Sequence, residues 1–435
     1  MRRQPPRALI YLAALALLAG GAPAATGAIT RDVLDNGLVV IASPSETGTI
    51  AAVAVLVKAS ALHEPADKAG LRQLLQQTSV RGSENLSGAE LASALDELGA
   101  ELDAGPALDY VWLSLVCLGQ DLPRAMELLA EVVRRPRFAE REVEGRRESA
   151  LRYVESLRSN PFETAQNLLR QGLYEGHPYS RPTQGTKDSL AAITRSDLVE
   201  FHRRYYVPNN TVIAVAGAAS RDAVLETTRR HFGNWGRADV PLLDPQPIPA
   251  LERSTMHLRE APVSEAYLML GFAVTPLTAD TYPVWEVVRS LLGRGMGSRL
   301  FAALREKAPA AYQADAYYFP LAHTGCVAGY VFADAAELES AKEALIAEFE
   351  RLRRTEVERA ELERAQEFAV GTYALSHQKA RDRAFHLARY EAIGLGWKFD
   401  ERYAGAIRAV TAAEVRDAAR RHFTHYSLGL VLPEN

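Results

Sequence analysis

The sequence has little cysteine, no excess of positive charge and no apolar run long enough to cross a membrane. Its 50 lysines and arginines are outnumbered by 54 acidic residues, so it lacks the cationic surplus of phosphate-binding proteins. The longest apolar run, Ala8 to Ala19, has twelve residues, too few for a transmembrane helix. The only cysteines, Cys117 and Cys326, are 209 residues apart, and two buried free thiols are favoured over a disulfide. We therefore expect no nucleic-acid partner and no integral membrane segment in the mature protein.

The first residues have the composition of a secretory leader. Met1 to Arg7 contains three arginines, the apolar run follows, and Ala22-Pro23-Ala24 supplies small residues at which leader peptides are cleaved. Residues 1–24 are therefore predicted to be a signal peptide. Its removal lowers the formal charge from −4 to −7, and the mature protein is expected in the periplasm.

A proline-rich segment divides the mature chain into two halves of similar size. It runs from Gly236 to Glu252, contains four prolines and has no helical periodicity, which is typical of an extended linker. The flanking parts, residues 29–235 and 253–435, are predicted to be an N-terminal and a C-terminal domain.

Both halves show the same order of patterns, which indicates a duplicated unit. In each half two strand-like segments precede two helical ones, and a further apolar strand precedes a longer helix. The matched segments are 38–43, 50–60, 69–80, 87–98, 111–120 and 122–133 in the first half, and 255–259, 266–274, 279–292, 298–308, 326–335 and 337–354 in the second. We predict an α+β fold in which each half is an antiparallel sheet covered by helices, with the two homologous halves enclosing a cavity.

Three neutral amides lie on one side of the helix predicted over residues 69–80. Gln73, Gln76 and Gln77 have the spacing i, i+3 and i+4, which places their side chains together. One explanation is that they form an ordinary exposed polar surface of the helix, with no relation to a functional site. The flanking sequence favours a different interpretation.

Four phrases of the sequence resemble, in order, the pitrilysin/insulinase family of zinc peptidases. They are KAGLRQLLQQTSVRGS at 68–83, HPYSRPTQGT at 177–186, FHRRYYVPNNTVIAVAG at 201–217 and LLGRGMGSRLFAALREKAPAAY at 291–312. The resemblance covers essentially the whole mature chain. It is strongest to the two-domain subfamily that includes the mitochondrial processing peptidase and its bacterial relatives.

The resemblance implies that the glutamines replace a zinc site. In active members of the family the first helix carries His-x-x-Glu-His, followed shortly by a Lys/Arg-Gly-Thr/Ser motif. Alignment on the Arg-Gly-Ser at 81–83 places the two histidines at Gln73 and Gln77 and the catalytic glutamate at Gln76. The third zinc ligand of the family is a glutamate ahead of an Asn-Pro turn, and its position corresponds to Tyr153.

The four replacements remove the chemistry of a catalytic zinc centre. Zinc is bound by imidazole nitrogens and carboxylate oxygens, whereas a glutamine amide is neutral and a phenol ionises only near pH 10. Gln76 has no lone pair basic enough to take a proton from a metal-bound water. We therefore expect no catalytic residue, no metal and no cofactor in this chain, with zinc in a partner subunit.

The second half retains residues that the family uses to hold a substrate. Arg305 and Tyr312 match the arginine and tyrosine that, in this family, hydrogen-bond a peptide near the scissile bond; both can donate to carbonyl oxygens. The alternative is an ordinary ion pair for Arg305 and a core position for Tyr312. In the first half, residues 101–104 match the edge strand with which the family pairs a substrate. Asp103 replaces the usual asparagine there, which puts that pairing in doubt.

These observations favour a subunit of a zinc metalloendopeptidase that is catalytically inactive alone. A zinc-bearing paralogue would form a heterodimer with it, and this chain would bind peptide and complete the chamber. The rival interpretation is a structural subunit without a role in peptide processing, like the core proteins of respiratory complexes that resemble this family. A third, a stand-alone metallopeptidase with an unconventional site, would require metal in the purified protein.

Overall fold

The computed structural model describes residues 27–241, 248, 250–307 and 311–434, with the backbone alone at 305–307. The predicted signal peptide lies outside these residues, and so do residues 242–247 and 249 of the predicted linker. Within them, no helix is both long and apolar enough to cross a bilayer.

The first half is built around a six-stranded sheet. Its strands β3 and β6 are buried along almost their whole length, as expected for apolar runs covered on both faces. Its strands are β1 (Thr30–Val33), β2 (Val39–Pro44), β3 (Ile50–Val57), β4 (Glu101–Pro106), β5 (Val111–Leu118) and β6 (Thr211–Gly217). Its helices are α2 (Leu71–Ser79), α3 (Gly88–Glu97), α4 (Leu122–Arg134), α5 (Glu140–Ser156), α6 (Pro161–Leu173), α7 (Lys187–Ala192), α8 (Arg195–Tyr205) and α9 (Arg221–Phe232).

The second half repeats this plan around a five-stranded sheet. Its strands are β7 (Thr255–Ala261), β8 (Ala266–Val274), β9 (Gln313–Pro320), β10 (Gly325–Ala333) and β11 (Ser427–Pro433). Its helices are α10 (Thr281–Gly293), α11 (Arg299–Phe301), α12 (Leu338–Arg354), α13 (Arg359–Ser376), α14 (Ala380–Ala392), α15 (Phe399–Ala409) and α16 (Ala412–His422). The helix predicted at 298–308 is only partly α-helical, because a wider π-helical segment at Ala302–Lys307 replaces its second part.

The strand orders confirm the α+β fold and correct one detail of it. The first sheet has the order β1-β2-β6-β3-β5-β4 and the second has β7-β11-β8-β10-β9, so β2 and β7 occupy matching places. The sheets are mixed rather than purely antiparallel, because β2 pairs in parallel with β6 and β7 pairs in parallel with β11. A parallel pair needs a long crossover connection, and here the connection is nearly the whole half-chain.

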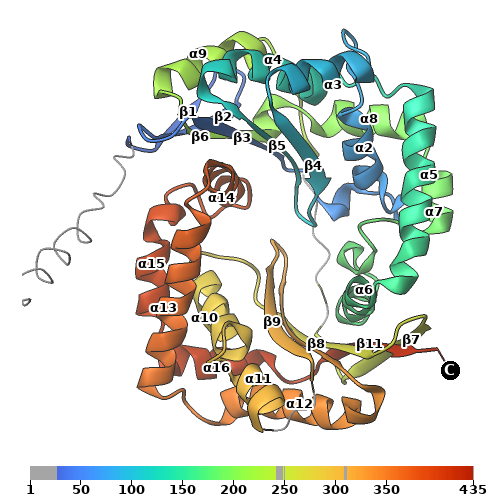
Figure 1. The fold of residues 1–435 in the computed structure, drawn as a ribbon, viewed down its shortest axis with the longest axis vertical. Coiled ribbons are helices and arrows are strands. Elements are labelled where there is room, and N and C mark those ends of the chain that lie inside the picture. The colour runs from blue at the N-terminus through green and yellow to red at the C-terminus, as the bar shows by residue number, and fades with distance from the viewer. Residues whose placement is uncertain (1–26, 242–247, 249, 308–310, 435) are drawn as a thin grey trace, which may run out of the picture.

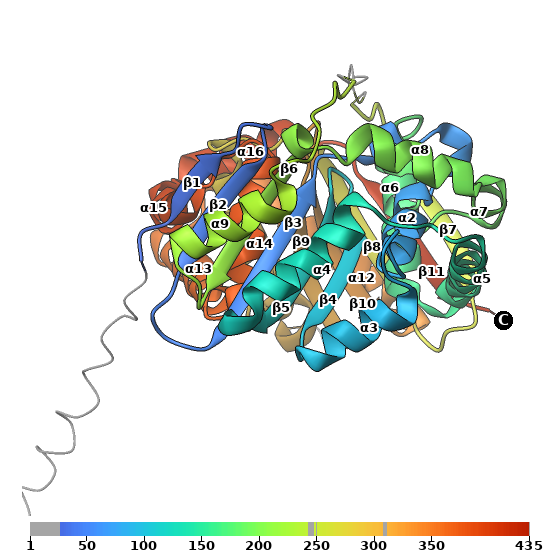
Figure 2. The ribbon, with the colours of Figure 1, turned by 90° about the horizontal axis from the view of Figure 1, so that it is seen from above.

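Each half covers one face of its sheet with its own helices and the other face with a helix from the opposite half. Helix α6 of the first half packs on β7, β8 and β11, and helix α14 of the second half packs on β3 and β6 (Figures 1 and 2). The approach of α6 requires glycine in β11, because a Cβ at Gly429 would lie 2.2 Å from the carbonyl oxygen of Ala165. This reciprocal exchange of helices ties the two halves together.

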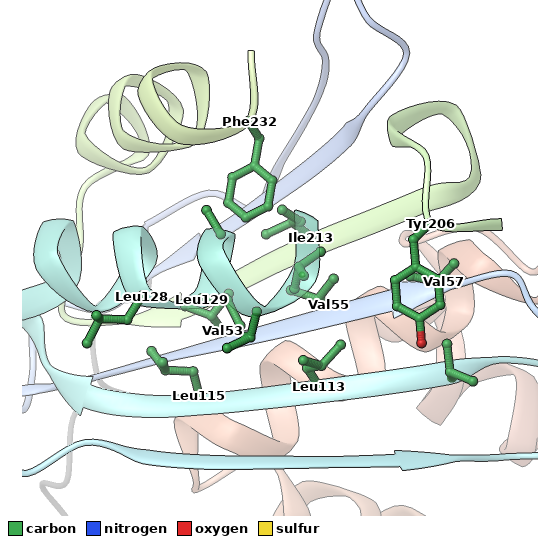
Figure 3. Packing of buried hydrophobic residues seen from close by; sticks show 14 of the residues in the cluster. Val53, Val55, Val57, Leu113, Leu115, Leu128, Leu129, Tyr206, Ile213 and Phe232 are labelled. Carbon is green, nitrogen blue, oxygen red and sulfur yellow. The ribbon is translucent and has the colours of Figure 1, made fainter. Parts of the chain in front are cut away.

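The other face of the first sheet holds a large apolar core beneath α4 and α9. Val53, Val55, Leu113 and Leu129 interlock there, and the ring of Tyr206 enters the same layer beside Val57 (Figure 3). Cys117 belongs to this core, and Cys326 to the cluster beneath α6; both are free and buried, as predicted. Burial raises the pKa of Cys117 to about 11 and that of Cys326 to about 12, so both thiols are protonated at neutral pH.

Candidate functional site

Helix α2, which carries the three glutamines, is held between β4, α5 and α8. It begins after Gly70, whose φ of 92° is a left-handed conformation that glycine adopts without strain. A Cβ at Gly70 would also lie 2.9 Å from the carbonyl oxygen of Gln184. The start of α2 is therefore fixed by close backbone packing.

Gln76, which the family resemblance aligns with the catalytic glutamate, is part of the interior. Its side chain is fully buried; Nε2 donates to the carbonyl oxygen of Trp112 over 2.8 Å, and Oε1 accepts from the hydroxyl of Tyr206 over 2.6 Å. Trp112 lies in β5 and Tyr206 follows α8, so one amide joins three elements. A glutamine suits this place because it donates at one end and accepts at the other.

Gln73 and Gln77, which the resemblance aligns with the two histidines, are half-buried on the same helix. Oε1 of Gln77 is shielded from solvent and has no hydrogen-bond partner among the described residues. A buried acceptor without a donor costs about 1–3 kcal/mol of stability. The position therefore tolerates a polar group rather than requiring it for the fold.

Tyr153, which the resemblance aligns with the third ligand, is hydrogen-bonded to a carboxylate. It lies on α5, which packs against α2, and its hydroxyl donates to both oxygens of Glu163 over 2.8 and 2.9 Å. Partial burial and the Glu163 carboxylate raise the pKa of the Tyr153 phenol to about 12. Glu163 also accepts from Nε2 of Gln184 over 3.1 Å. The phenol remains protonated at any physiological pH and is a poor zinc ligand.

The four side chains do not fit zinc. Three are neutral amides, one of them hydrogen-bonded at both ends inside the protein, and the fourth is a protonated phenol. In the part of the chain that the structure describes, no three histidine, cysteine, aspartate or glutamate side chains gather as a metal site would require. No hydrolytic step can be derived for these residues.

The two predicted substrate-holding residues lie in the second half, around the π-helical segment. Arg305 belongs to that segment, and its side chain lies outside the described residues. Tyr312 is 53% exposed and is not a core residue; its hydroxyl donates to Oδ2 of Asp334 over 3.0 Å. This bond keeps the phenol protonated by raising its pKa. Tyr312 is therefore a surface residue whose hydroxyl is oriented by Asp334.

Each sheet has one inner edge strand whose outer side pairs with no described strand, β4 in the first half and β9 in the second. Figure 1 shows both strands on the side where the halves face each other. Asp103 of β4 accepts a hydrogen bond from Arg381 of α14 over 2.6 Å. The carboxylate that replaces the usual asparagine is thus bound to the opposite half.

Two charged side chains that the sequence pattern did not single out lie near the end of β4, the buried Arg72 and the half-buried Asp109. Arg72 donates through Nη1 to the carbonyl oxygens of Ala107 and Ala59, and its own backbone N–H donates to Glu64 over 2.8 Å. Asp109 accepts from the backbone N–H of Ala322 in the second half over 2.9 Å. An arginine within the apolar start of α2 was the signal that could have revealed the first of these.

Comparison with protein families gives two matches that together span most of the chain. Residues 39–187 match the profile described as insulinase (peptidase family M16), and residues 192–368 match the one described as peptidase M16 inactive domain. An uncharacterized zinc protease of Mycobacterium bovis is 30% identical over 312 residues, which is 71% of each chain. The uncharacterized zinc protease YmxG of Bacillus subtilis is 24% identical over 93% of this chain and 98% of its own.

Two solved structures share the fold over nearly the whole chain. The peptidase M16 inactive domain from Pseudomonas fluorescens superposes with a TM-score of 0.85 at 22% identity, covering 94% of this chain and 98% of its own. A protease from Helicobacter pylori gives a TM-score of 0.86 at 21% identity, covering 94% of this chain and 100% of its own. At this identity the likeness concerns the fold alone.

Proposed function

The chain belongs to peptidase family M16, and we propose that within this family it is the non-catalytic subunit of a heterodimeric zinc peptidase. A zinc-bearing paralogue would supply the metal and the general base. This chain would supply half of the chamber and hold the peptide. The zinc would reside in the partner alone.

The single observation that carries this proposal is the state of Gln76. Its amide is buried and hydrogen-bonded at both ends, so this side chain stabilises the packing of the first half. All three other positions of the site also lack a strong zinc ligand. A chain that has lost the whole donor set but keeps the family fold can serve the reaction only through binding.

Features of both halves support a role in holding peptide. Tyr312 lies at the surface, and the outer edges of β4 and β9, which pair with no described strand, can add main-chain hydrogen bonds to an extended peptide. Arg305 is included on the family resemblance, since its guanidinium stays charged at any relevant pH.

Peptide cleavage tests the proposal. The zinc-bearing paralogue is assayed alone, then with this chain, and then with Tyr312→Phe, Arg305→Ala and the exposed control Arg402→Ala. Stimulation by the native chain and by Arg402→Ala, with at least a several-fold loss for Tyr312→Phe and Arg305→Ala, supports a peptide-holding subunit. Equal stimulation by all four proteins removes the two residues from that role.

The second candidate is a structural subunit that binds no peptide. The ion pair between Asp103 and Arg381 favours it, because it engages a β4 side chain where a substrate would pair. A stable complex with the paralogue and no stimulation of cleavage would establish this alternative. We also propose periplasmic residence, from the composition of residues 1–24; N-terminal sequencing of the exported protein tests it, and an intact leader would contradict it.

A further inference from the structure

A cavity of about 290 Å³ lies at the junction of the two halves. Leu108, Gln166 and Leu169 line it from the first half, and Tyr318, Leu321 and Cys326 line it from the second. We call this cavity the junction pocket. Its volume is near the lower end of the range for small-molecule sites, about 300 Å³, which is enough for one large side chain but not for a folded segment.

The walls of the junction pocket are held in place by hydrogen bonds within the first half and between the two halves. Asp109, next to Leu108, accepts from the backbone N–H of Ala322 over 2.9 Å and also from the hydroxyl of Tyr179. The segment after β4 is further fixed by Arg72, which donates to the carbonyl oxygen of Ala107. The hairpin between β9 and β10 is therefore bound directly to the first half beside the pocket.

The lining residues of the pocket favour an uncharged ligand group. Arg170 is the one charged residue among those that line it, and its Nε and Nη2 donate to the carbonyl oxygen of Tyr179 over 2.9 and 2.7 Å. No carboxylate lines the pocket to pair with a cationic guest. Burial keeps the Cys326 thiol neutral by raising its pKa to about 12. Because Arg170 already donates to backbone carbonyl oxygens and most other lining residues are apolar, the pocket suits an apolar group, for which burial is the main gain.

The inner edge strands β4 and β9 both end at this pocket. Strand β4 ends at Pro106, directly before the lining segment, and β9 ends at Pro320, which itself lines the pocket. A peptide that adds to either edge would run toward the cavity and direct alternate side chains to one side. We propose that the junction pocket binds a bulky apolar side chain of an extended peptide held at these edges. This inference rests on the proposed function and adds a substrate class to it.

Fluorescence anisotropy with labelled decapeptides tests the proposal on the full mature chain. The probes are alanine-serine peptides in which a single phenylalanine is moved through the sequence, with the all-alanine-serine peptide as reference. The variants Gln166→Trp and Leu108→Trp fill the pocket from α6 and from the segment after β4. Val199→Trp, on the exposed side of α8, is the matched control, and thermal melting checks that every variant is folded.

The expected result is that at least one phenylalanine peptide binds roughly tenfold or more tightly than the reference. This preference should disappear in Gln166→Trp and Leu108→Trp and persist in Val199→Trp. Two results would refute apolar binding in the junction pocket but leave the proposed function standing. One is equal affinity for peptides with and without phenylalanine, and the other is a phenylalanine preference that both filled variants retain. Failure of every peptide to bind overturns both the pocket and the peptide-holding role.

Discussion

The hydroxyl of Tyr206 donates a hydrogen bond to Oε1 of Gln76 over 2.6 Å, inside the core of the first half. The two residues are 130 positions apart in sequence and belong to different helical regions. Because the other end of the Gln76 amide donates to Trp112, the side chain has no freedom left to act on a substrate. The residue that the family resemblance aligns with the general base is here a structural cross-link.

Removing the Tyr206 hydroxyl should leave Oε1 of Gln76 without its donor. We expect Tyr206→Phe to lower the free energy of unfolding by about 1–3 kcal/mol, the usual cost of a buried polar atom left unsatisfied. Urea denaturation measures this change. Tyr205→Phe, which removes the neighbouring hydroxyl, is the control; an equal loss in both variants would contradict the cross-link.

Restoring the family's glutamate at this place should make the fold sensitive to pH. In Gln76→Glu, burial and the nearby carbonyl oxygen of Trp112 disfavour the carboxylate and raise its folded-state pKa above the unfolded value of about 4.3. The unfolded state then loses its proton first, so stability falls as pH rises from about 4.3 toward neutrality. Thermal melts from pH 4 to 8 should diverge from those of the native protein, whereas Gln73→Glu, on the half-buried side of α2, should diverge less.

Zinc binding should return only when strong donors return. Helix α2 places positions 73 and 77 one turn apart, and α5 carries position 153 alongside. The variant Gln73→His, Gln77→His, Tyr153→Glu is expected to retain zinc after dialysis, measured by elemental analysis, while the native chain retains only substoichiometric amounts. Stoichiometric zinc that is bound to the native chain and lost in Gln73→Ala would refute the degenerate site.

Buried histidines should make the native fold sensitive to acid. Burial lowers the pKa values of His63, His202 and His386 to about 4. Between pH 6.5 and 4 the unfolded state therefore binds more protons than the folded state, and stability falls as pH falls through this window. His202→Gln should reduce that loss by roughly 1–3 kcal/mol in urea denaturation at pH 4.5, relative to the exposed variant His425→Gln. Identical pH profiles for both variants would argue against the burial effect.

The exchange of α6 and α14 should make the halves depend on each other. Residues 29–235 expressed alone would expose the sheet face that α14 covers, and residues 253–435 alone would expose the face beneath α6. We expect each fragment to aggregate or bind a hydrophobic dye, and co-expression to restore a soluble complex. In the intact chain Leu387→Ala on α14 should cost about 2–5 kcal/mol and Leu375→Ala, an exposed control, much less. A fragment that unfolds cooperatively by itself would contradict this dependence.

Much of the plan of the molecule was accessible from the sequence. The strands at 50–60 and 266–274 were recognisable because fully apolar runs of this length are typical of covered strands. The parallel pairs β2–β6 and β7–β11 were not, because pairing between segments distant in sequence depends on the whole connection between them. The π-helical segment that carries Arg305 was also missed, since it continues a pattern that suits an α-helix.

The sequence by itself determined the chemistry of the candidate site. Residue identity alone decides whether a side chain can donate electrons to zinc, so the amides at 73, 76 and 77 and the phenol at 153 give these positions no strong zinc ligand. Only the tertiary structure decided what these side chains do instead. The bonds of Gln76, the exchange of α6 and α14 and the junction pocket join residues far apart in the chain, and such contacts depend on how the elements pack in space.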